Sequence, residues 1–159
     1  MKVVCDVDGV IADPCKYVEK HLLGGKSPDW EKYYDKTLEF PCIESMVEVI
    51  KSLYDSGHGI YFVTARPELN RAPTYIWLKS KMGFTPCNLF MSNGEPSSLR
   101  SNREFKLEII NKIVPDLVIE DEPEAVDLFR SRGYIVLQVH GFRICDRDLV
   151  PDLGGKDES

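Results

Sequence analysis

The sequence predicts an α/β fold in which a parallel sheet is flanked by helices. Short apolar segments alternate along the chain with segments whose apolar residues follow helical spacing. Alternation of this kind favours parallel strands joined by right-handed crossovers. The 159 residues are enough for one domain with a substantial core. We expect that domain to cover residues 1–150, followed by a loose polar tail over 151–159.

Five segments have the short, continuous apolar character of strands that are buried on both faces of a sheet. They are bounded by turn residues or by charged residues, which marks their ends. The predicted strands are Val3–Cys5, Gly59–Thr64, Asn88–Met91, Asp116–Ile119 and Tyr134–Val139.

Five helices follow from apolar residues spaced three and four positions apart. Pro123 suits the first position of the last helix, and Pro115 ends the helix before it. The polar stretch Ser92–Arg103 is expected to be a loop. The predicted helices cover residues 13–23, 43–56, Arg71–Met82, Glu104–Val114 and Pro123–Arg132.

Residues 11–41 interrupt the connection between the first strand and the helix predicted over 43–56. This stretch is rich in aromatic residues, and we expect it to form a small lid over the end of the first strand. Each ring could line a ligand site or pack back onto the domain. The rings in question are Trp30, Tyr33, Tyr34 and Phe40.

The composition narrows the class of partner and the compartment. Lysine and arginine total 20 against 26 acidic residues, a net charge of −6, which disfavours a protein that binds duplex nucleic acid through a basic surface. Contact with a nucleotide or a strand end remains open. Five scattered cysteines without a C-x-x-C pair suit a reduced cytoplasm. No stretch resembles a signal peptide or a membrane span, so no membrane contact is expected.

Two acids directly follow the first strand. Residues i and i+2 of an extended chain point the same way, so Asp6 and Asp8 are expected to lie together at its carboxyl end. Like charges this close repel each other unless a cation or a shared proton intervenes. Gly9 lets the backbone turn tightly beside a bound substrate. The alternative is that the two acids only begin a solvated turn.

Polar side chains also follow two other strands, at what a parallel sheet makes the same edge. Thr64 and Arg66 follow the second strand, Glu120 and Asp121 follow the fourth, and Lys106 lies at the start of a helix. A cluster of oxygen ligands suits a hard cation such as Mg²⁺. No Ser-His or Cys-His pair is suitably placed.

These groups fit nucleophilic attack on phosphorus. Asp6 would form an aspartyl phosphate, while a metal ion and cationic side chains offset the repulsion between carboxylate and phosphate. Arg66 could instead cap a helix or pair with Glu68. Four further residues could contact a ligand, but residues of these types are more often solvated or packed: Arg71, Arg100, Arg103 and His140.

From Lys2 to about Val139 the chain resembles phosphatases of the haloacid dehalogenase (HAD) superfamily, which implies a Rossmann-like sheet. Within it, the chain most resembles the 3′-phosphatase module of bacteriophage polynucleotide kinase, and next the 5′(3′)-deoxyribonucleotidases. Four motifs carry the resemblance, in order along the chain: Asp6-Val7-Asp8-Gly9-Val10, Thr64, Lys106 and Glu120-Asp121.

The resemblance implies a role for each matching residue. Asp6 would be the nucleophile, and Asp8 would protonate the leaving oxygen and later activate water. Thr64 would donate a hydrogen bond to the phosphoryl group, and Lys106 would balance the charge of the intermediate. Arg66, which matches an arginine of the polynucleotide kinase module, would contact the phosphate.

The resemblance also implies a magnesium site and shows two departures from the pattern. Asp6, the main-chain carbonyl of Asp8, and Asp121 would hold Mg²⁺. Glu120 stands where the polynucleotide kinase module has an aspartate, so its longer side chain would reach the metal through water. Asn102 also replaces an aspartate of that module.

We therefore expect a Mg²⁺-dependent phosphomonoesterase that acts on nucleotide phosphates. A free (deoxy)nucleoside monophosphate fits the acidic chain and the aromatic lid. A 3′-phosphate on a DNA or RNA end fits the closer family resemblance. A non-catalytic relative that binds a phosphate ligand would gain nothing from a nucleophilic aspartate. A phosphotransferase or sugar-phosphate mutase usually needs a larger cap to exclude water.

Overall fold

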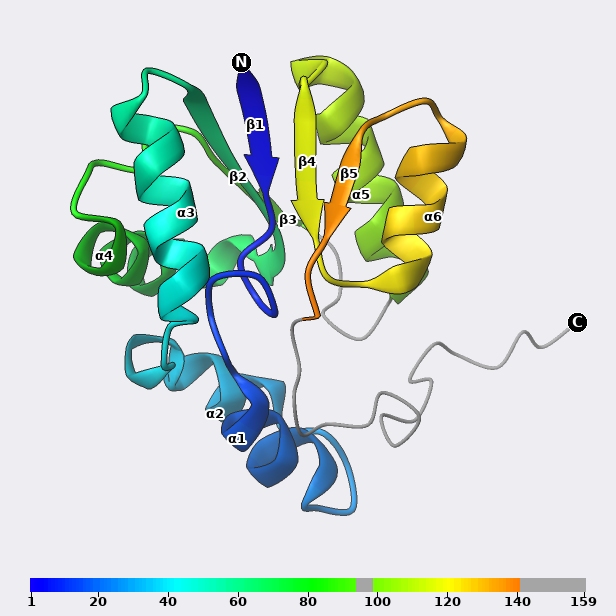
Figure 1. Ribbon diagram of the computed structural model, residues 1–159. Helices are drawn as coiled ribbons and strands as arrows, with labels where there is room; N and C mark the ends of the chain where they lie inside the picture. The colour runs from blue at the N-terminus through cyan, green and yellow to red at the C-terminus, as the bar shows by residue number, and fades with distance from the viewer. Residues whose placement is uncertain (94–98, 141–159) are drawn as a thin grey trace, which may run out of the picture.

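The computed structural model describes residues 1–93 and 99–140 (Figure 1). The predicted tail over 151–159 and part of the predicted loop lie outside these residues.

The described strands form one parallel sheet in the order β3-β2-β1-β4-β5. β1 is central, with Val4 opposite Tyr61 of β2 on one side and Val118 of β4 on the other. The order along the chain reverses between β1 and β4, and open α/β sheets bind ligands at such a switch point. The strands are β1 (Lys2–Cys5), β2 (Gly59–Pro67), β3 (Leu89–Ser92), β4 (Leu117–Glu120) and β5 (Val136–Gln138).

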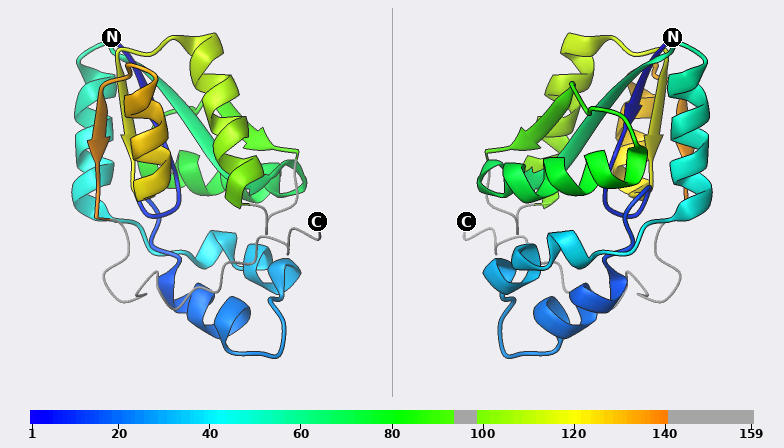
Figure 2. Two further views of the ribbon diagram at one scale, coloured as in Figure 1. Left: turned by 90° about the vertical axis from the view of Figure 1, so that its right-hand side faces the viewer. Right: turned by 90° about the vertical axis from the view of Figure 1, so that its left-hand side faces the viewer.

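Helices cover both faces of the sheet (Figures 1 and 2). Because side chains alternate along a strand, Val3 and Cys5 join one core cluster and Val4 the other. The first cluster includes residues of α3 (Glu44–Asp55) and α4 (Arg71–Met82), and the second includes residues of α5 (Leu99–Ile113) and α6 (Pro123–Ser131). The predicted α/β fold is confirmed.

Most predicted elements are present, and the clearest differences concern two helices. α5 begins at Leu99, so the prediction of a loop up to Arg103 is wrong for its last five residues. Polar residues at 101–103 favoured a loop, yet Asn102 is buried within the helix. The helix expected over 13–23 divides into α1 (Cys15–Tyr17) and a π-helical segment, η1 (Val18–Leu23).

Residues 11–41, here called the insertion, lie beyond the carboxyl ends of the strands (Figure 1). Besides α1 and η1 they contain α2 (Trp30–Asp35) and the 3₁₀ turn η2 (Thr37–Glu39). The two ends of the insertion are paired, because Asp13 N donates to Pro41 O over 2.9 Å. The chain therefore enters and leaves the insertion at neighbouring positions.

The aromatic rings of the insertion divide into two groups. Tyr33 and Phe40 are buried in the core, and Trp77 of α4 donates its indole N–H to the carbonyl of Phe40 over 2.8 Å. Trp30 and Tyr34 are half-buried, with their rings stacked at 5.9 Å. The first group packs back onto the domain, while the second keeps part of its surface exposed.

In the part of the chain that the structure describes, we find no helix both long enough and apolar enough to cross a bilayer.

Candidate active site

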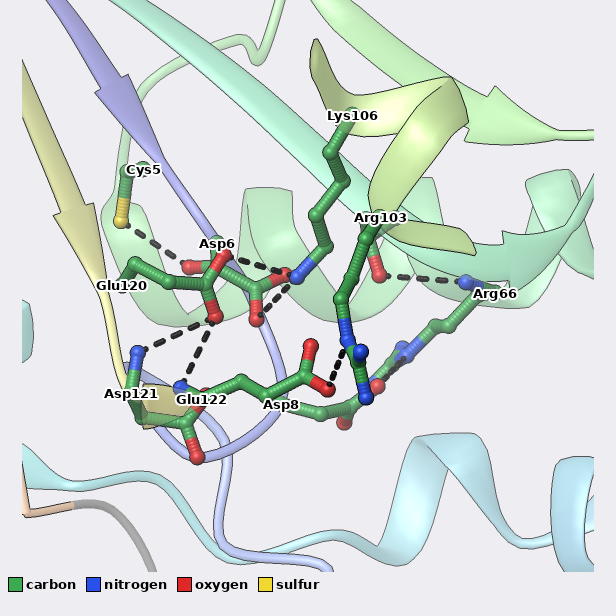
Figure 3. A network of polar contacts seen from close by, with 10 residues as sticks. Cys5, Asp6, Asp8, Arg66, Arg103, Lys106, Glu120, Asp121 and Glu122 are labelled. Carbon is green, nitrogen blue, oxygen red and sulfur yellow. Dashed lines mark hydrogen bonds and ion pairs between the residues drawn. The ribbon is translucent and has the colours of Figure 1, made fainter. Parts of the chain in front are cut away.

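Three neighbouring strands deliver the predicted site residues to one edge of the sheet. Asp6 and Asp8 follow the central strand β1, and the backbone N–H of Asp6 donates to Ile119 O of β4 over 3.0 Å. Glu120 is the last residue of β4. The acids after β1 and those after β4 thus meet at the switch point of the sheet (Figure 3).

The first group of side chains, here called the Asp6 cluster, consists of Asp6, Lys106, Glu120 and Asp121. Lys106 Nζ lies 3.0 Å from Asp6 Oδ2 and 2.8 Å from Glu120 Oε2. Glu120 Oε1 accepts hydrogen bonds from the backbone N–H groups of Asp121 and Glu122, over 3.1 and 3.2 Å. All four cluster side chains are buried. Lys106 reaches them from the middle of α5. The sequence had indicated the start of a helix, and the difference arises because α5 begins earlier than predicted.

The electrostatics of the cluster favour an added cation. Burial raises the pKa of Asp6 well above its usual value, and the carboxylate of Glu120 raises it further. Burial alone would lower the pKa of Lys106, but Asp6 and Glu120 raise it well above the usual value. Burial likewise opposes ionisation of Glu120, yet Lys106 lowers its pKa. The lysine therefore stays charged between the two carboxylates that it contacts.

The carboxylates of the Asp6 cluster are arranged as metal ligands could be. One oxygen each from Asp6, Glu120 and Asp121 lies within 4.8 Å of the other two. An all-oxygen, buried set of this kind suits a hard divalent cation. Since three carboxylates face one ammonium group, such a cation would also relieve their mutual repulsion.

Gly9 allows the acidic residues after β1 and β4 to approach each other. Its φ of +84° lies in the left-handed region, and a Cβ there would stand 2.0 Å from Asp121 Oδ2. Any side chain at this position would collide with the Asp121 carboxylate. The sequence predicted a tight turn at Gly9, and the structure shows that the turn also makes room for a candidate metal ligand.

Asp8 forms a second centre, with Arg66 of β2. Arg66 Nε donates to Asp8 Oδ2 over 2.8 Å, and Nη2 donates to Asp8 Oδ1 over 2.7 Å. The arginine side chain is fully buried, while 22% of the Asp8 side chain is exposed. The guanidinium also faces the rings of Phe40 and Trp77, at 5.3 and 5.9 Å. Arg66 thus meets the second motif acid, and neither caps a helix nor pairs with Glu68 as the alternative had it.

The other residues considered in the sequence analysis lie outside the Asp6 cluster and the Asp8–Arg66 pair. Thr64 is buried, and its hydroxyl accepts the backbone N–H of Arg66 over 3.3 Å. Arg71 pairs with Glu68. Arg103 lies within α5 and pairs with Glu122. His140 is exposed, and the side chain of Arg100 lies outside the described part of the structure.

Three buried polar residues near Arg66 escaped the sequence analysis: Thr37, Asn70 and Thr74. Asn70 directly precedes α4, and Thr74 lies one turn further on, in line with the buried Trp77 and Leu78. A polar residue on the apolar stripe of a helix signals a buried hydrogen-bond partner. The partners of Thr74 are Arg66 and Asn70, eight and four positions away, whereas Asn70 also reaches Thr37, 33 positions away, which no local spacing indicates.

A curated protein of Oceanobacillus iheyensis, named "Putative nucleotidase", is 30% identical to the chain over 87 residues. The match covers 55% of this chain and 43% of that protein. The chain therefore spans less than half the length of this relative.

Two solved structures share the fold. A chain of the Pnkp1/Rnl/Hen1 complex superposes with a TM-score of 0.64 at 20% identity, covering 87% of this chain and 44% of that one. The class C acid phosphatase from Bacillus anthracis with tungstate bound gives a TM-score of 0.67 at 15% identity, covering 99% of this chain and 73% of that one. At these identities the likeness concerns the fold alone.

The family of the chain follows from a sequence-family model. The model described as HAD superfamily, subfamily IIIB (acid phosphatase), matches residues 1–117, which is most of the chain. The match includes Asp6, Asp8, Thr64 and Lys106 and ends just before the acids that follow β4. The chain thus belongs to the HAD superfamily, as the motifs predicted, and the matching model adds its subfamily, IIIB, a family of acid phosphatases and hence of phosphoric monoester hydrolases.

Proposed function

We propose that the chain is a Mg²⁺-dependent phosphomonoesterase that acts on nucleotide phosphates through an aspartyl-phosphate intermediate. The observation that carries this proposal is the Asp6 cluster, in which the motif aspartate lies 3.0 Å from a buried lysine and beside two further carboxylates. A nucleophilic carboxylate needs cationic groups to approach a phosphate dianion. The cluster supplies one such group and the ligands for another.

Asp6, Asp121 and the main-chain carbonyl of Asp8 are the proposed ligands of Mg²⁺, with Glu120 bound directly or through water. Bound there, Mg²⁺ would offset the negative charge of the carboxylates and of the substrate phosphate. Lys106 keeps its charge between Asp6 and Glu120, so it holds the nucleophile in place and balances the intermediate.

The proposed reaction has two steps, each assisted by Asp8. In the first, an oxygen of Asp6 attacks phosphorus, the bond from phosphorus to the leaving oxygen breaks, and Asp8 gives that oxygen a proton. In the second, Asp8 takes a proton from water, the water oxygen attacks phosphorus, and the bond to Asp6 breaks to release phosphate. Thr64 donates a hydrogen bond to the phosphoryl group in both steps.

A free (deoxy)nucleoside monophosphate is the preferred substrate in this proposal. The relative from Oceanobacillus is named as a nucleotidase. The half-buried rings of Trp30 and Tyr34 lie on the insertion, which we propose acts as a lid. Burial raises the pKa of Tyr34, and the negative charge of Asp8 raises it further, so the phenol interacts electrostatically with Asp8. A base bound there could stack on these rings.

A 3′-phosphate on a DNA or RNA end is the second candidate. It is supported by the fold shared with a chain of the Pnkp1/Rnl/Hen1 assembly, which is described as an RNA repair complex. A lid of about thirty residues covers the site only in part and would admit a strand end.

Steady-state rates separate the two candidates. The chain is assayed on a nucleoside monophosphate and on a 3′-phosphorylated oligonucleotide, each with and without Mg²⁺. We expect turnover of both only with Mg²⁺, and the nucleotide to give the higher kcat/KM. A preference of about 10²-fold for the oligonucleotide, which is roughly 2.7 kcal/mol of transition-state binding, would select the second candidate. No turnover of either ester would contradict the proposed function.

The cytoplasmic location expected from the scattered cysteines also remains a prediction.

A further inference from the structure

A row of buried polar side chains leads from the insertion to Asp8. In order, it consists of Thr37 on η2, Asn70 before α4, Thr74 on α4 and Arg66 on β2. These four residues are here called the polar chain. We propose that Arg66 is a positioning residue that sets the orientation of the Asp8 carboxylate, and that the polar chain makes this orientation depend on the seating of the insertion. The inference rests on the proposed function, in which Asp8 transfers protons.

The contact between Arg66 and Asp8 determines orientation as well as charge. Two parallel hydrogen bonds, 2.8 and 2.7 Å long, join two nitrogens of the guanidinium to the two oxygens of the carboxylate. A planar fork of this kind fixes the plane of the carboxylate, which a single lysine ammonium cannot do. Asp8 lies in the turn after β1 and is partly exposed, and within the described part of the chain Arg66 is the side chain that holds its carboxylate.

The guanidinium itself cannot turn. Its Nη1 donates to Thr74 Oγ1 over 3.2 Å, and the rings of Phe40 and Trp77 lie beside it. The side chain is fully buried, and three of its five N–H groups, one on each nitrogen, donate these hydrogen bonds. Arg66 is therefore placed to act on the reaction through Asp8 and not as a phosphate ligand.

Asn70 joins the arginine to the insertion. Its side-chain nitrogen carries two hydrogens, one donated to Thr37 Oγ1 over 2.8 Å and the other to Thr74 Oγ1 over 3.4 Å. The hydroxyl of Thr37 in turn donates to Tyr34 O over 2.8 Å. Arg66 Nη1 and Asn70 Nδ2 share one acceptor, Thr74 Oγ1, so a continuous line of hydrogen bonds runs from the insertion to Asp8. Buried networks of this kind hold their members in one arrangement.

General acid catalysis depends on that arrangement, because the proton donor must lie within hydrogen-bond reach of the leaving oxygen. A misoriented Asp8 should slow esters whose leaving oxygen needs a proton, such as nucleoside monophosphates. It should have little effect on dinitrophenyl phosphate, whose leaving group departs as a stable anion. The ratio of kcat on these two esters thus reports the placement of Asp8.

The experiment measures this ratio for the wild-type chain and for Arg66→Lys, with Asp8→Asn as the reference for a lost acid. We expect Asp8→Asn to lower the ratio by about 10²-fold or more and Arg66→Lys by roughly 10-fold or more, within the range that general acid catalysis contributes. The inhibition constant of inorganic phosphate should change less than about twofold in Arg66→Lys, which is under 0.5 kcal/mol. Arg71→Lys, at an exposed ion pair, is the matched control and should leave the ratio unchanged.

A second variant tests the link to the insertion. Asn70→Ala removes both hydrogen bonds of the amide, and we expect it to lower the ratio by a few-fold without changing phosphate inhibition. Both esters are assayed on one preparation, so the fraction of folded protein cancels in the ratio. If Arg66→Lys yields no folded protein, Asn70→Ala carries the test of the whole polar chain.

Each outcome bears on a different part of the inference. An unchanged ratio in Arg66→Lys with a rise of about tenfold in the phosphate inhibition constant would show that Arg66 binds phosphate itself and would overturn the positioning role. An unchanged ratio in Asn70→Ala alone would overturn the link to the insertion. Absence of wild-type turnover on both esters would instead contradict the proposed function.

Discussion

Asp6 and Asp8 are two residues apart in the sequence, yet they lie in different electrostatic surroundings. Asp6 faces Lys106 within a group of three carboxylates. Among the described residues, Asp8 forms its ion pair with Arg66, so one acid meets one cation there. Both cations are buried, but the lysine presents a point charge to several acids and the arginine presents a fork to one.

The difference separates the two tasks of the proposed reaction. The Asp6 cluster has more negative than positive charge, which favours a cation and a phosphate bound through it. The Asp8–Arg66 pair has no such surplus, and its contacts lead toward the insertion. One centre is thus suited to hold the phosphoryl group, and the other to handle protons beside the leaving group.

The largest effect expected is that of Asp6→Asn. Because an amide is a very weak nucleophile, turnover of every phosphate ester should fall by at least roughly 10⁴-fold, whatever its leaving group. This contrasts with the selective loss expected for Asp8→Asn. The measurement is kcat on a nucleoside monophosphate and on dinitrophenyl phosphate.

The control for Asp6→Asn is Asp127→Asn, the same change at an exposed position on α6. It should retain full activity, and circular dichroism should show the same fold in both variants. Substantial turnover of either ester by Asp6→Asn would remove the distinction between the two centres.

Metal removal should affect the Asp6 cluster next most strongly. Treatment with a chelator is expected to lower activity by at least about 10²-fold, since a metal ion contributes several kcal/mol of charge stabilisation. Added Mg²⁺ should restore it, and Asp121→Asn should need a higher Mg²⁺ concentration for the same rate. Activity is measured against Mg²⁺ concentration after elemental analysis of the treated protein. Full activity in metal-free protein would show that the cluster works without a cation.

Gly9→Ala tests how closely the two acidic turns approach each other. Gly133→Ala is the control, because Gly133 also has a positive φ, of +87°, but a Cβ there meets nothing within 4 Å. The control should lose about 1–2 kcal/mol of unfolding free energy from backbone strain alone. Gly9→Ala should lose roughly 1–3 kcal/mol more from the collision with Asp121. Urea unfolding measures both, and equal losses would mean that Asp121 is not held against Gly9.

The smallest effect concerns the anchoring of the insertion on the Asp8 side. Trp77→Phe removes the N–H that donates to Phe40 O, so the free energy of unfolding should fall by about 1–2 kcal/mol. Thermal unfolding compares it with Tyr75→Phe, a half-buried site on the same helix, which should lose less. An equal loss in the two variants would show that the indole hydrogen bond contributes nothing to stability.

Much of the fold was predictable because its signals are local. The five strands follow from short apolar runs and α4 from apolar periodicity, and both signals depend only on near neighbours in the chain. The start of α5 did not follow, because Asn102 is polar and is buried only through packing against the rest of the domain. Among the site residues, the proximity of Asp6 and Glu120 was predictable, because the strands of a parallel sheet end at one edge.

The sequence by itself determined the order of the strands and helices and the convergence of acids at one sheet edge, since both depend on short-range spacing and strand direction. Only the tertiary structure decided that Arg66 pairs with Asp8, 58 positions away, and that Asn70 reaches Thr37 on the insertion. Such pairs depend on where packing directs each side chain. A buried donor takes whichever acceptor the folded chain brings within reach, and no local pattern contains that information.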